Sequence, residues 1–390
     1  MAEKTNYVKK GKNGREYKYY RLSKRLPTGE DKEFTGKNKK EATAKKDEYM
    51  EGLHLGLKAD YNEMTLEKFM RVWLFDVMRM ELADSSFDRY EGIYRNYIKE
   101  TSFAKLKVYE IDRLTLQRNY NLMFESGKTT AKIRNLNKLL KTFFNFAIAE
   151  GYIVKNPCFK IIIPKNKEAL DEDEDVFDVD PFSEDELKLI SEHVRPEMKM
   201  LFQLDLGTGM RLGEMLALTE RDFDFHNAEV KINKTLKTVK VIKEDGSYEY
   251  KTVVKPPKSK SSNRIIPIPS SLLAPLQRHI ISEKEKYLKK GQPYTKSSLI
   301  FTTESCNYID CKNLLRAWQR TLKRAGVRYR KLHCIRHTYA TKLFEADVPL
   351  ITISKLLGHH DIEITARIYV HVMPKEKDNA AQKLNYLFNV

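Results

Sequence analysis

Short alternating runs of aromatic and polar residues characterise the first 58 positions. The runs Glu16 to Leu26 and Asp31 to Thr35 flank Pro27-Thr28-Gly29, a composition typical of a tight turn, and therefore predict paired strands. The stretch Lys39 to Leu53 is rich in Lys, Glu and Ala, which predicts a helix. We expect residues 1–58 to form a small sheet plus one helix.

Residues 64–157 follow a helical period. Apolar stripes are formed by Leu66, Phe69, Val72 and Trp73, and by Tyr90, Ile93, Tyr94 and Tyr97. A longer stripe lies within Lys128 to Glu150 and comprises Ile133, Leu136, Leu140, Phe143, Phe144 and Ala147. Gly151 is a suitable helix stop, and Asn156-Pro157 closes the unit. A helix bundle is therefore expected over residues 64–160.

An acidic stretch, Glu168 to Asp178, follows the helical unit. Its like charges repel and extend the chain, which predicts a linker over residues 161–180, although a regulatory acidic flap has the same composition. The capping signature Ser183-x-x-Glu186 then starts a helix. The rest of residues 181–390 predicts helices, strands from about Glu229 to Ile268, and helices again. Glu244-Asp-Gly-Ser247 has the composition of a hairpin turn.

Composition indicates a folded protein with a polyanionic partner. Hydrophobic residues make up 41% of the 390 positions, so folded domains are expected rather than disorder. The formal net charge of +17 favours nucleic acid, because phosphate contacts release counterions, although anionic membrane surfaces also attract basic proteins.

The apolar segments and the cysteines indicate the cellular compartment. No stretch approaches the ~20 apolar residues that span a bilayer, and the first residues lack an apolar signal core. A cytoplasmic protein without a membrane partner is therefore expected, associated with the nucleoid if its polyanionic partner is DNA. The four cysteines, Cys158, Cys306, Cys311 and Cys334, form no C-x-x-C pair, so reduced thiols are expected rather than disulfides or a zinc ribbon.

Two basic faces are candidates for nucleic-acid contact. Side chains alternate along a strand, so Tyr19 and Arg21 share one face of the predicted sheet. On the long helix, the face opposite the apolar stripe carries Lys132, Arg134, Asn135 and Lys138. Because any exposed sheet or helix has a polar face, solvated surfaces are the alternative in both cases.

A glycine-punctuated turn, Gly207-Thr-Gly-Met-Arg211-Leu-Gly-Glu214, leads into a helix. It presents Arg211 near a helix start, where backbone N–H groups favour an anion, although a surface arginine has the same pattern. We expect Glu214 to orient the helix or an arginine. The turn mimics a dinucleotide fingerprint, but its spacing differs and a helical segment precedes it.

A basic turn precedes the last predicted strand in Pro256-Pro-Lys258-Ser-Lys260-Ser-Ser-Asn-Arg264-Ile-Ile-Pro267. A lysine at such a turn can reach a DNA backbone. It can also protonate a departing oxygen if neighbouring charge and partial burial lower its pKa. A solvated basic loop is the alternative.

The segment His333-Cys-Ile-Arg336-His337 predicts a shared helix face for His333 and Arg336. His333 and His337 also have the spacing of zinc ligands. The metalloprotease glutamate and an obvious third ligand are missing, however, so no metal is expected. We expect His337 to be a hydrogen-bonded core histidine.

The last motif is Leu356-Leu-Gly-His359-His360, with Tyr369 ten residues after His359. Each motif is weak alone, but the order R…K…H-x-x-R…H…Y with L-L-G-H resembles the tyrosine recombinase, or phage integrase, family across residues 181–390. The basic first unit, the helical second unit and the extra strands before Lys258 look most like integrases of conjugative transposons.

The resemblance implies a catalytic set of six side chains: Arg211, Lys260, His333, Arg336, His359 and Tyr369. Tyr369 would be the nucleophile, forming a 3′-phosphotyrosine and freeing a 5′-hydroxyl. The arginines would bind the nonbridging oxygens, and Lys260, in preference to Lys258, would protonate the leaving oxygen. His333 would assist proton transfer at Tyr369, and His359 would hydrogen-bond the phosphate. Neither a metal, another cofactor nor ATP is implied.

The resemblance also implies a multidomain fold. Residues 1–58 would be a small α+β arm-binding domain with a three-stranded sheet plus helix, and residues 64–160 an all-α core-binding domain. Residues 181–390 would be a mainly α, mixed α+β catalytic domain with a small antiparallel sheet. A C-terminal apolar stripe would dock on a neighbouring subunit or cap its own domain: Ala380, Ala381, Leu384, Leu387 and Phe388.

Double-stranded DNA with core and arm sites is the implied partner, bound by a tetramer on two duplexes. An excisionase or a DNA-bending protein is a further candidate partner. A type IB topoisomerase shares the chemistry but needs neither an arm-binding unit nor an exchange helix. A DNA-binding regulator with a decayed active site is the non-enzyme alternative, and the presence of all six catalytic residue types argues against it.

Overall fold

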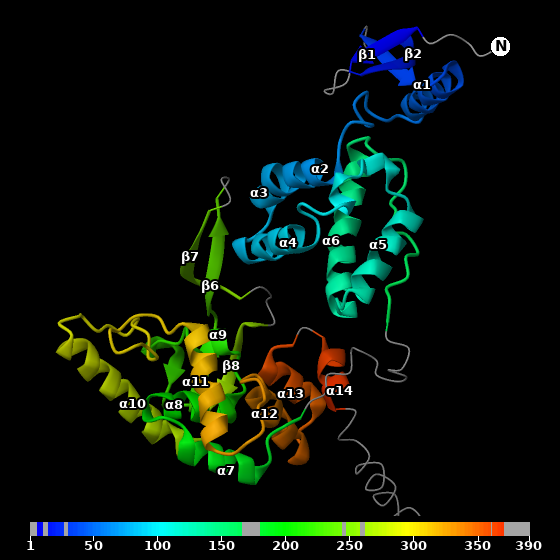
Figure 1. Ribbon diagram of the computed structural model, residues 1–390. Helices are drawn as coiled ribbons and strands as arrows, with labels where there is room; N and C mark the ends of the chain where they lie inside the picture. Colours follow the sequence, from blue (N-terminus) through cyan, green and yellow to red (C-terminus); the bar gives the residue numbers. More distant parts are fainter. Residues whose placement is uncertain are drawn as a thin grey trace, which may run out of the picture. The chain divides into compact units, whose positions relative to one another are not determined.

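The structure is a computed structural model that describes residues 6–10, 15–26, 30–165, 180–243, 247–257, 262–359 and 361–369. Positions 364 and 367–369 are described by their backbone alone. The chain divides into two compact units (Figure 1). The N-terminal unit comprises Met1–Glu168 and the short segment Ile242–Ser247, and the C-terminal unit comprises Ala169–Val241 and Tyr248–Val390.

The N-terminal unit begins with an antiparallel sheet in the order β1-β2-β3, packed against helix α1. The bounds are β1 Tyr7–Lys10, β2 Glu16–Arg25, β3 Asp31–Gly36 and α1 Lys39–His54. Asn38 caps α1 by accepting a 2.9 Å hydrogen bond from the Glu41 backbone N–H. Phe34 and Tyr49 are buried between sheet and helix, with ring centroids 5.4 Å apart. The expected three-stranded sheet plus helix is confirmed, and its turn at 27–29 lies outside the described residues.

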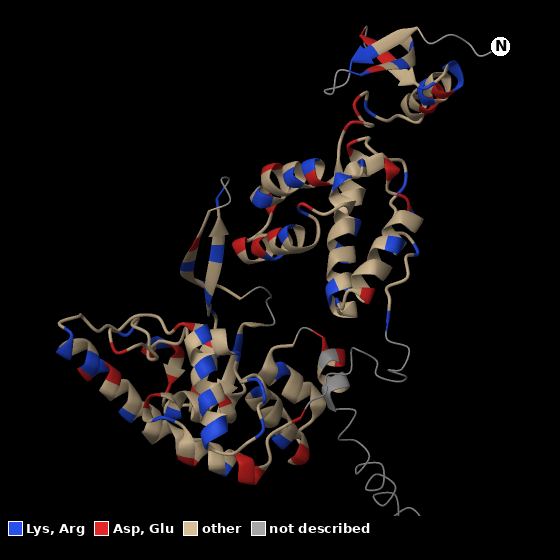
Figure 2. Ribbon diagram, viewed as in Figure 1, with Lys and Arg blue, Asp and Glu red and all other residues tan. Residues whose placement is uncertain are grey.

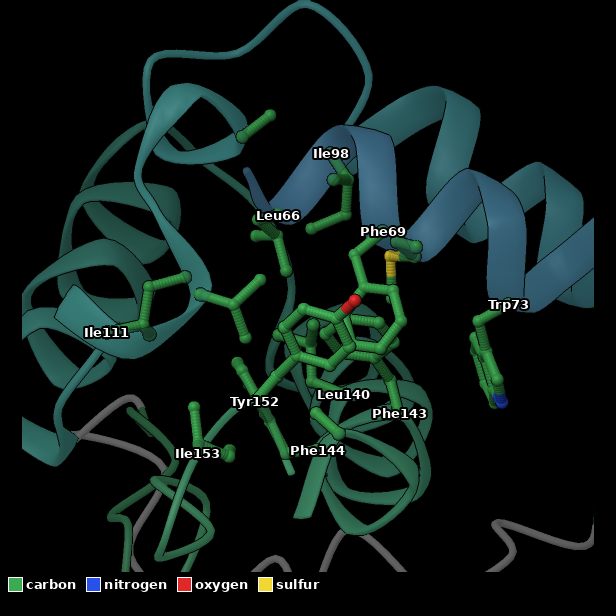
Figure 3. Packing of buried hydrophobic residues seen from close by; sticks show 14 of the residues in the cluster. Leu66, Phe69, Trp73, Ile98, Ile111, Leu140, Phe143, Phe144, Tyr152 and Ile153 are labelled. Atoms are coloured by element: carbon green, nitrogen blue, oxygen red, sulfur yellow. The ribbon is translucent and has the colours of Figure 1, made fainter. Parts of the chain in front are cut away.

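The same unit continues as a helix bundle. Its bounds are α2 Leu66–Val72, π-helix η1 Trp73–Met78, α3 Arg79–Glu81, α4 Asp84–Tyr97, 3₁₀ turns η2 Phe103–Lys105 and η3 Val108–Glu110, α5 Arg113–Glu125 and α6 Thr130–Ala149. The six apolar positions predicted for α6 are all buried. Figure 3 shows Phe143 and Phe144 of this set in the core with Phe69 and Tyr152, and the rings of Phe69 and Phe143 lie 5.4 Å apart.

One position of the predicted α2 stripe is wrong. Val72 is 40% exposed, whereas Met70 and Leu74 are fully buried. From Leu66 onward, the buried residues recur at every third or fourth position, which is the period of a helix. Val72 does not fit this spacing and therefore lies on the face of the helix that is turned to solvent. The hydrophobic character of Val72 alone suggested burial, but its angle around the helix decides its environment.

The end of α6 follows the predicted signal. Gly151 has a φ of 71°, a left-handed conformation that glycine adopts without strain. Its backbone N–H donates to Ile148 at 3.0 Å, and that of Tyr152 donates to Ala147 at 2.9 Å. Asn156 then binds back to the helix through the Asn145 side chain at 2.6 Å. The acidic stretch predicted as a linker lies almost wholly outside the described residues, which resume at position 180.

The C-terminal unit has the predicted order of helices, strands and helices. Its helices are α7 Glu184–His193, α8 Pro196–Thr208, α9 Leu212–Met215, η4 Glu220–Asp222, α10 Ser270–Lys289, α11 Cys311–Arg324, α12 Cys334–Glu345, α13 Leu350–Leu357 and α14 Ile362–Tyr369. Its strands are β4 Phe223–Asp224, β5 Glu229–Ile232, β6 Thr235–Ile242, β7 Tyr248–Lys255 and β8 Arg264–Pro267. The strands form an antiparallel sheet in the order β4-β5-β8 and a β6-β7 hairpin.

Local signals in this unit match the sequence. Ser183 and Glu186 form the predicted capping box at the start of α7. A 2.8 Å bond joins the Lys243 backbone N–H to the Ser247 carbonyl at the end of the β6-β7 hairpin, while positions 244–246 of the predicted turn lie outside the described residues. Among helices in the described part of the chain, none combines the length and apolar character that crossing a bilayer requires.

Helix α8 forms the centre of this unit. It is buried on most of its surface, and Phe202 stacks on Trp318 of α11 with ring centroids 6.2 Å apart. The helix ends at Gly209, whose φ of 57° is left-handed. A Cβ atom at this position would overlap the ring of Tyr339. This glycine turn directs the chain from the core to Arg211.

Candidate active site

Arg211 lies where α8 gives way to α9. It is the N-cap of α9, and its backbone N–H donates to Glu214 Oε2 at 3.0 Å. Its guanidinium donates through Nη1 to Glu214 Oε1 at 3.0 Å and through Nη2 to the Gly358 carbonyl at 3.3 Å. Arg211 therefore stands at a helix start as predicted, and Glu214 has the expected orienting role.

Arg336 lies in the first turn of α12 and is 2% exposed. Its Nη1 donates to the Gly209 carbonyl at 2.7 Å, and its Nη2 donates to the Leu357 carbonyl at 2.6 Å and to His359 Nε2 at 3.1 Å. Burial, and then the nearby charges of other arginines, lower the pKa of Arg336 to about 9. The guanidinium therefore stays protonated at neutral pH and joins the ends of α8 and α13.

The tautomer of His359 follows from its two partners. Its Nε2 accepts from Arg336, which can only donate, so Nδ1 carries the proton and donates to Thr365 Oγ1 at 2.8 Å. Burial, followed by the charges of Arg336 and Arg211, lowers the pKa of His359 to about 3. The ring is therefore neutral at physiological pH.

His333 and Arg336 line one cavity of about 380 Å³, so their predicted common face is confirmed. His333 is exposed at its rim, with Lys331 and Tyr329 also lining the cavity. The protein around the His333 ring displaces enough water to lower its pKa, and neighbouring positive charges lower it further. The buried carboxyl of Asp205 also lines this cavity, and its Oδ1 has no hydrogen-bond partner among the residues that the structure describes. Burial raises the pKa of Asp205 well above its usual range.

His337 differs from its prediction. It is half-buried and meets the His333 ring edge-on at 4.8 Å, and its imidazole makes no hydrogen bond within the described part of the chain. The prediction of a hydrogen-bonded core histidine is therefore wrong. His337 lies in the first turn of α12, where its ring packs against His333 instead. Across the described residues, no group of three or more His, Cys, Asp or Glu side chains is placed to hold a metal ion.

The structure describes the side chains of only some of the predicted catalytic residues. Lys258 and Lys260 lie outside the described residues. Tyr369 is the last residue of α14, and only its backbone is described. Among the predicted set, the structure thus brings together the side chains of Arg211, Arg336 and His359, with His333 at the adjoining cavity.

Arg264, the first residue of β8, is a site residue that the sequence did not predict. Its side chain is 6% exposed and binds Glu214 as well as the Leu356 carbonyl, next to the residues that bind Arg211 and Arg336. Arg264 was visible in the basic turn motif, but no local pattern indicated a partner 50 residues earlier in the chain.

The candidate DNA-binding residues differ in exposure. Arg21 is half-buried, stacks on the Tyr7 ring at 3.4 Å and pairs with Glu33 at 2.9 Å, and Tyr19 is also half-buried. Of the four α6 candidates, Lys132, Asn135 and Lys138 are exposed, whereas Arg134 is half-buried.

A second basic helix was not predicted from the sequence. Figure 2 shows basic residues on α6 and also along α11. The exposed cations of α11 include Lys312, Arg316, Arg320 and Lys323.

Comparisons with known sequences identify relatives. Residues 181–376 match the phage integrase family. The chain is 47% identical over its whole length to the whole of a XerC-like tyrosine recombinase from Caldanaerobacter subterraneus subsp. tengcongensis. It is 25% identical to the ICEBs1 integrase of Bacillus subtilis, over 86% of this chain and 89% of that protein.

Solved structures show the same fold. The Tn1549 transposon integrase in complex with a circular intermediate DNA has a TM-score of 0.66 at 19% identity, covering 82% of this chain and 99% of its own. A lambda integrase dimer bound to a COC′ core site has a TM-score of 0.55 at 16% identity, covering 94% and 95%. The expected fold class is thereby confirmed. The family match covers residues 181–376, and the XerC-like relative is similar over the full length of both chains. The chain therefore belongs to the phage integrase family and is a tyrosine recombinase, an enzyme that breaks and rejoins DNA in site-specific recombination.

Proposed function

We propose that this recombinase integrates and excises a mobile element by cutting DNA through a 3′-phosphotyrosyl link to Tyr369. The observation that carries the proposal is the convergence of Arg211, Arg336 and His359 within one hydrogen-bonded cluster. These residues come from three distant segments, and such a cluster of positive charge suits a single phosphate group.

The arginines supply the electrostatic part of the reaction. A phosphodiester resists attack because its negative oxygens repel the nucleophile, so catalysis requires charge neutralisation and positioning. Arg211 is the more accessible of the two guanidiniums, with 38% of its side chain exposed. Arg211 and Arg336 would share the nonbridging oxygens.

The histidines would have separate tasks. The lowered pKa of His333 keeps its imidazole neutral, so it can accept the phenolic proton of Tyr369. His359 uses Nε2 as an acceptor in the free protein. To donate to a phosphate oxygen it must gain a proton or exchange tautomer, and a bound phosphate favours protonation by offsetting the neighbouring arginine charges.

Lysine and tyrosine would complete the chemistry. A free phenol has a pKa near ~10, so Tyr369 needs both the positive field and a proton acceptor to attack at neutral pH. Lys260, or alternatively Lys258, would protonate the leaving 5′-oxygen. The phosphotyrosine preserves the energy of the cleaved bond, and attack by a second 5′-hydroxyl reverses the step without ATP.

The three domains would bind different parts of the DNA site. Residues 1–58 would bind arm sites, while residues 64–160 and 181–390 would enclose the core site, with residues 161–180 as the linker. Lambda integrase has been solved as a tetramer bound to a Holliday junction, which supports a tetramer of this chain on two duplexes. An excisionase or DNA-bending protein would assist, and the enzyme would act at the nucleoid. The C-terminal apolar stripe, Ala380 to Phe388, lies outside the described residues.

A nicked suicide substrate tests the proposal. This DNA carries the joined ends of the mobile element and releases a short fragment after cleavage, which prevents religation. Wild type is expected to form an SDS-resistant adduct, and Tyr369→Phe is expected to form none while still binding the DNA. Binding by wild type without any adduct would favour the decayed regulator. Relaxation of a plasmid without recombination between two sites would favour a topoisomerase.

A further inference from the structure

Arg264 is buried among the proposed catalytic residues without having a role in the chemistry. Its Nη1 and Nη2 donate to the two Glu214 carboxylate oxygens at 3.2 and 2.8 Å. Its Nε donates to the Leu356 carbonyl at 2.6 Å, and Nη1 also approaches the Ser262 carbonyl at 3.3 Å. One planar guanidinium thus binds two distant segments of the chain and a carbonyl of its own segment.

The first contact acts on Arg211. Glu214 has a side chain that is 5% exposed, and its carboxylate accepts from both Arg264 and Arg211. Although burial works in the opposite direction, the hydrogen bond and charge of Arg264 lower the pKa of Glu214 below its ordinary value. The ionised carboxylate is therefore held from one side by Arg264 and orients Arg211 from the other.

The second contact acts on the turn that carries His359. Leu356 lies at the end of α13, directly before the Leu357 and Gly358 carbonyls that bind Arg336 and Arg211. Gly358 has a left-handed φ of 67°, and a Cβ atom there would lie 3.0 Å from Arg264 Cδ and Nη1. The turn is thus packed directly on the arginine side chain.

The third contact is local to the start of β8. Arg264 begins β8, four residues after Lys260, and is paired with Ile232 of β5 in the sheet. Its bond to the Ser262 carbonyl fixes the backbone where the described chain resumes after position 261. Arg264 therefore also binds the backbone directly before its own strand.

We infer that Arg264 is a positioning residue that holds Arg211 and the turn carrying His359 in place around one phosphate. This inference rests on the proposed function. A lysine cannot take over the task, because a single ammonium lacks the planar fork that binds both carboxylate oxygens and a carbonyl together. A displacement of about 1 Å in a catalytic group can lower the rate on the order of 100-fold. Misplacement of these groups should therefore be seen as a slower rate of DNA cleavage.

The alternative is a buried ion pair that only stabilises the unit. Lys286 provides the matched control, because it pairs at 2.7 Å with Glu283, a carboxylate buried to a similar degree in the same unit. Lys286 lies on α10 and contacts Thr302, and its described contacts include no member of the proposed site. Lys286→Gln therefore removes a partly buried cation from a buried carboxylate without disturbing the proposed site.

The test compares Arg264→Lys, Arg264→Gln and Lys286→Gln in the full chain, each below its unfolding temperature. The measurements are affinity for the suicide substrate and the single-turnover cleavage rate of the saturated complex. Both Arg264 variants are expected to cleave about 10- to 100-fold more slowly, with affinity within about threefold of wild type. Lys286→Gln is expected to cleave at the wild-type rate.

A double variant identifies the route of the effect. If Arg264 acts on Arg211 through Glu214, Arg264→Gln combined with Glu214→Gln cleaves no more slowly than the slower single variant. Wild-type cleavage by Arg264→Lys, or an equal slowing in Lys286→Gln, would overturn the inference and leave the proposed function standing. Failure of wild type itself to form an adduct would instead remove the proposed function.

Discussion

Arg336 shows how a charge is kept within a protein interior. Each terminal nitrogen of its guanidinium donates to a backbone carbonyl, and one of them also donates to His359. These bonds offset the cost of removing the charge from water. These bonds also fix the direction of the side chain.

Arg336→Lys is expected to destabilise the C-terminal unit and abolish cleavage. An ammonium cannot satisfy both carbonyls and His359 in this geometry, and each buried polar group left unpaired costs about 1–3 kcal/mol. Urea unfolding followed by circular dichroism measures the loss. Arg320→Lys, an exposed substitution on α11, is the control and should change stability little. Equal stability of the Arg336 variant and wild type would contradict the hydrogen-bonding account.

The pKa of His359 predicts a pH dependence of stability. A histidine in the unfolded chain binds a proton near its ordinary pKa of 6.5, whereas folded His359 stays neutral down to about 3. The unfolded chain therefore binds more protons between these values, so stability is complete above pH 6.5 and falls as pH decreases through this window. At pH 5 the loss from this group is about 2 kcal/mol.

Unfolding free energies of wild type and His359→Gln between pH 7.5 and 5 test this effect. Wild type should lose about 2 kcal/mol more than the variant over this range. Parallel curves would show that His359 is protonated in the folded protein.

At the scale of elements, α6 could be predicted closely, because its apolar stripe and glycine stop are local signals. Val72 was misplaced because its hydrophobicity was given more weight than its angle on α2. The network around Arg264 has no local signal: Glu214 is 50 residues away, and Arg211 and Gly358 are 147 residues apart. The motif order pointed to Arg211, Arg336 and His359, which do converge, but periodicity could not indicate which buried side chain holds them in place.

The buried face of α6 predicts a large effect from a core truncation. Phe143 is fully buried, and its ring packs against Phe69 at 5.4 Å and Trp73 at 5.5 Å. Phe143→Ala should lower the free energy of unfolding by about 3–5 kcal/mol. Ile148→Ala on the same helix is the control, because Ile148 is 36% exposed and should have a much smaller effect. Similar losses for both variants in urea unfolding would mean that the α6 core is assigned wrongly.

At the scale of the whole molecule, a net charge of +17 should make DNA binding steeply dependent on salt. If the exposed α6 cations contact phosphates, Lys132→Gln with Lys138→Gln should reduce the slope of log affinity against log salt by about 2. Lys289→Gln with Lys290→Gln, exposed at the end of α10, should leave the slope unchanged. Unchanged slopes in both pairs would place the DNA on another face.

The identity of the residue that becomes joined to DNA tests the central claim most directly. Mass spectrometry of peptides from the trapped suicide-substrate complex should find the nucleotide on the phenolic oxygen of Tyr369 and on no other side chain. A nucleotide attached to any other tyrosine, or to a serine, would contradict the proposed arrangement around Arg211 and Arg336.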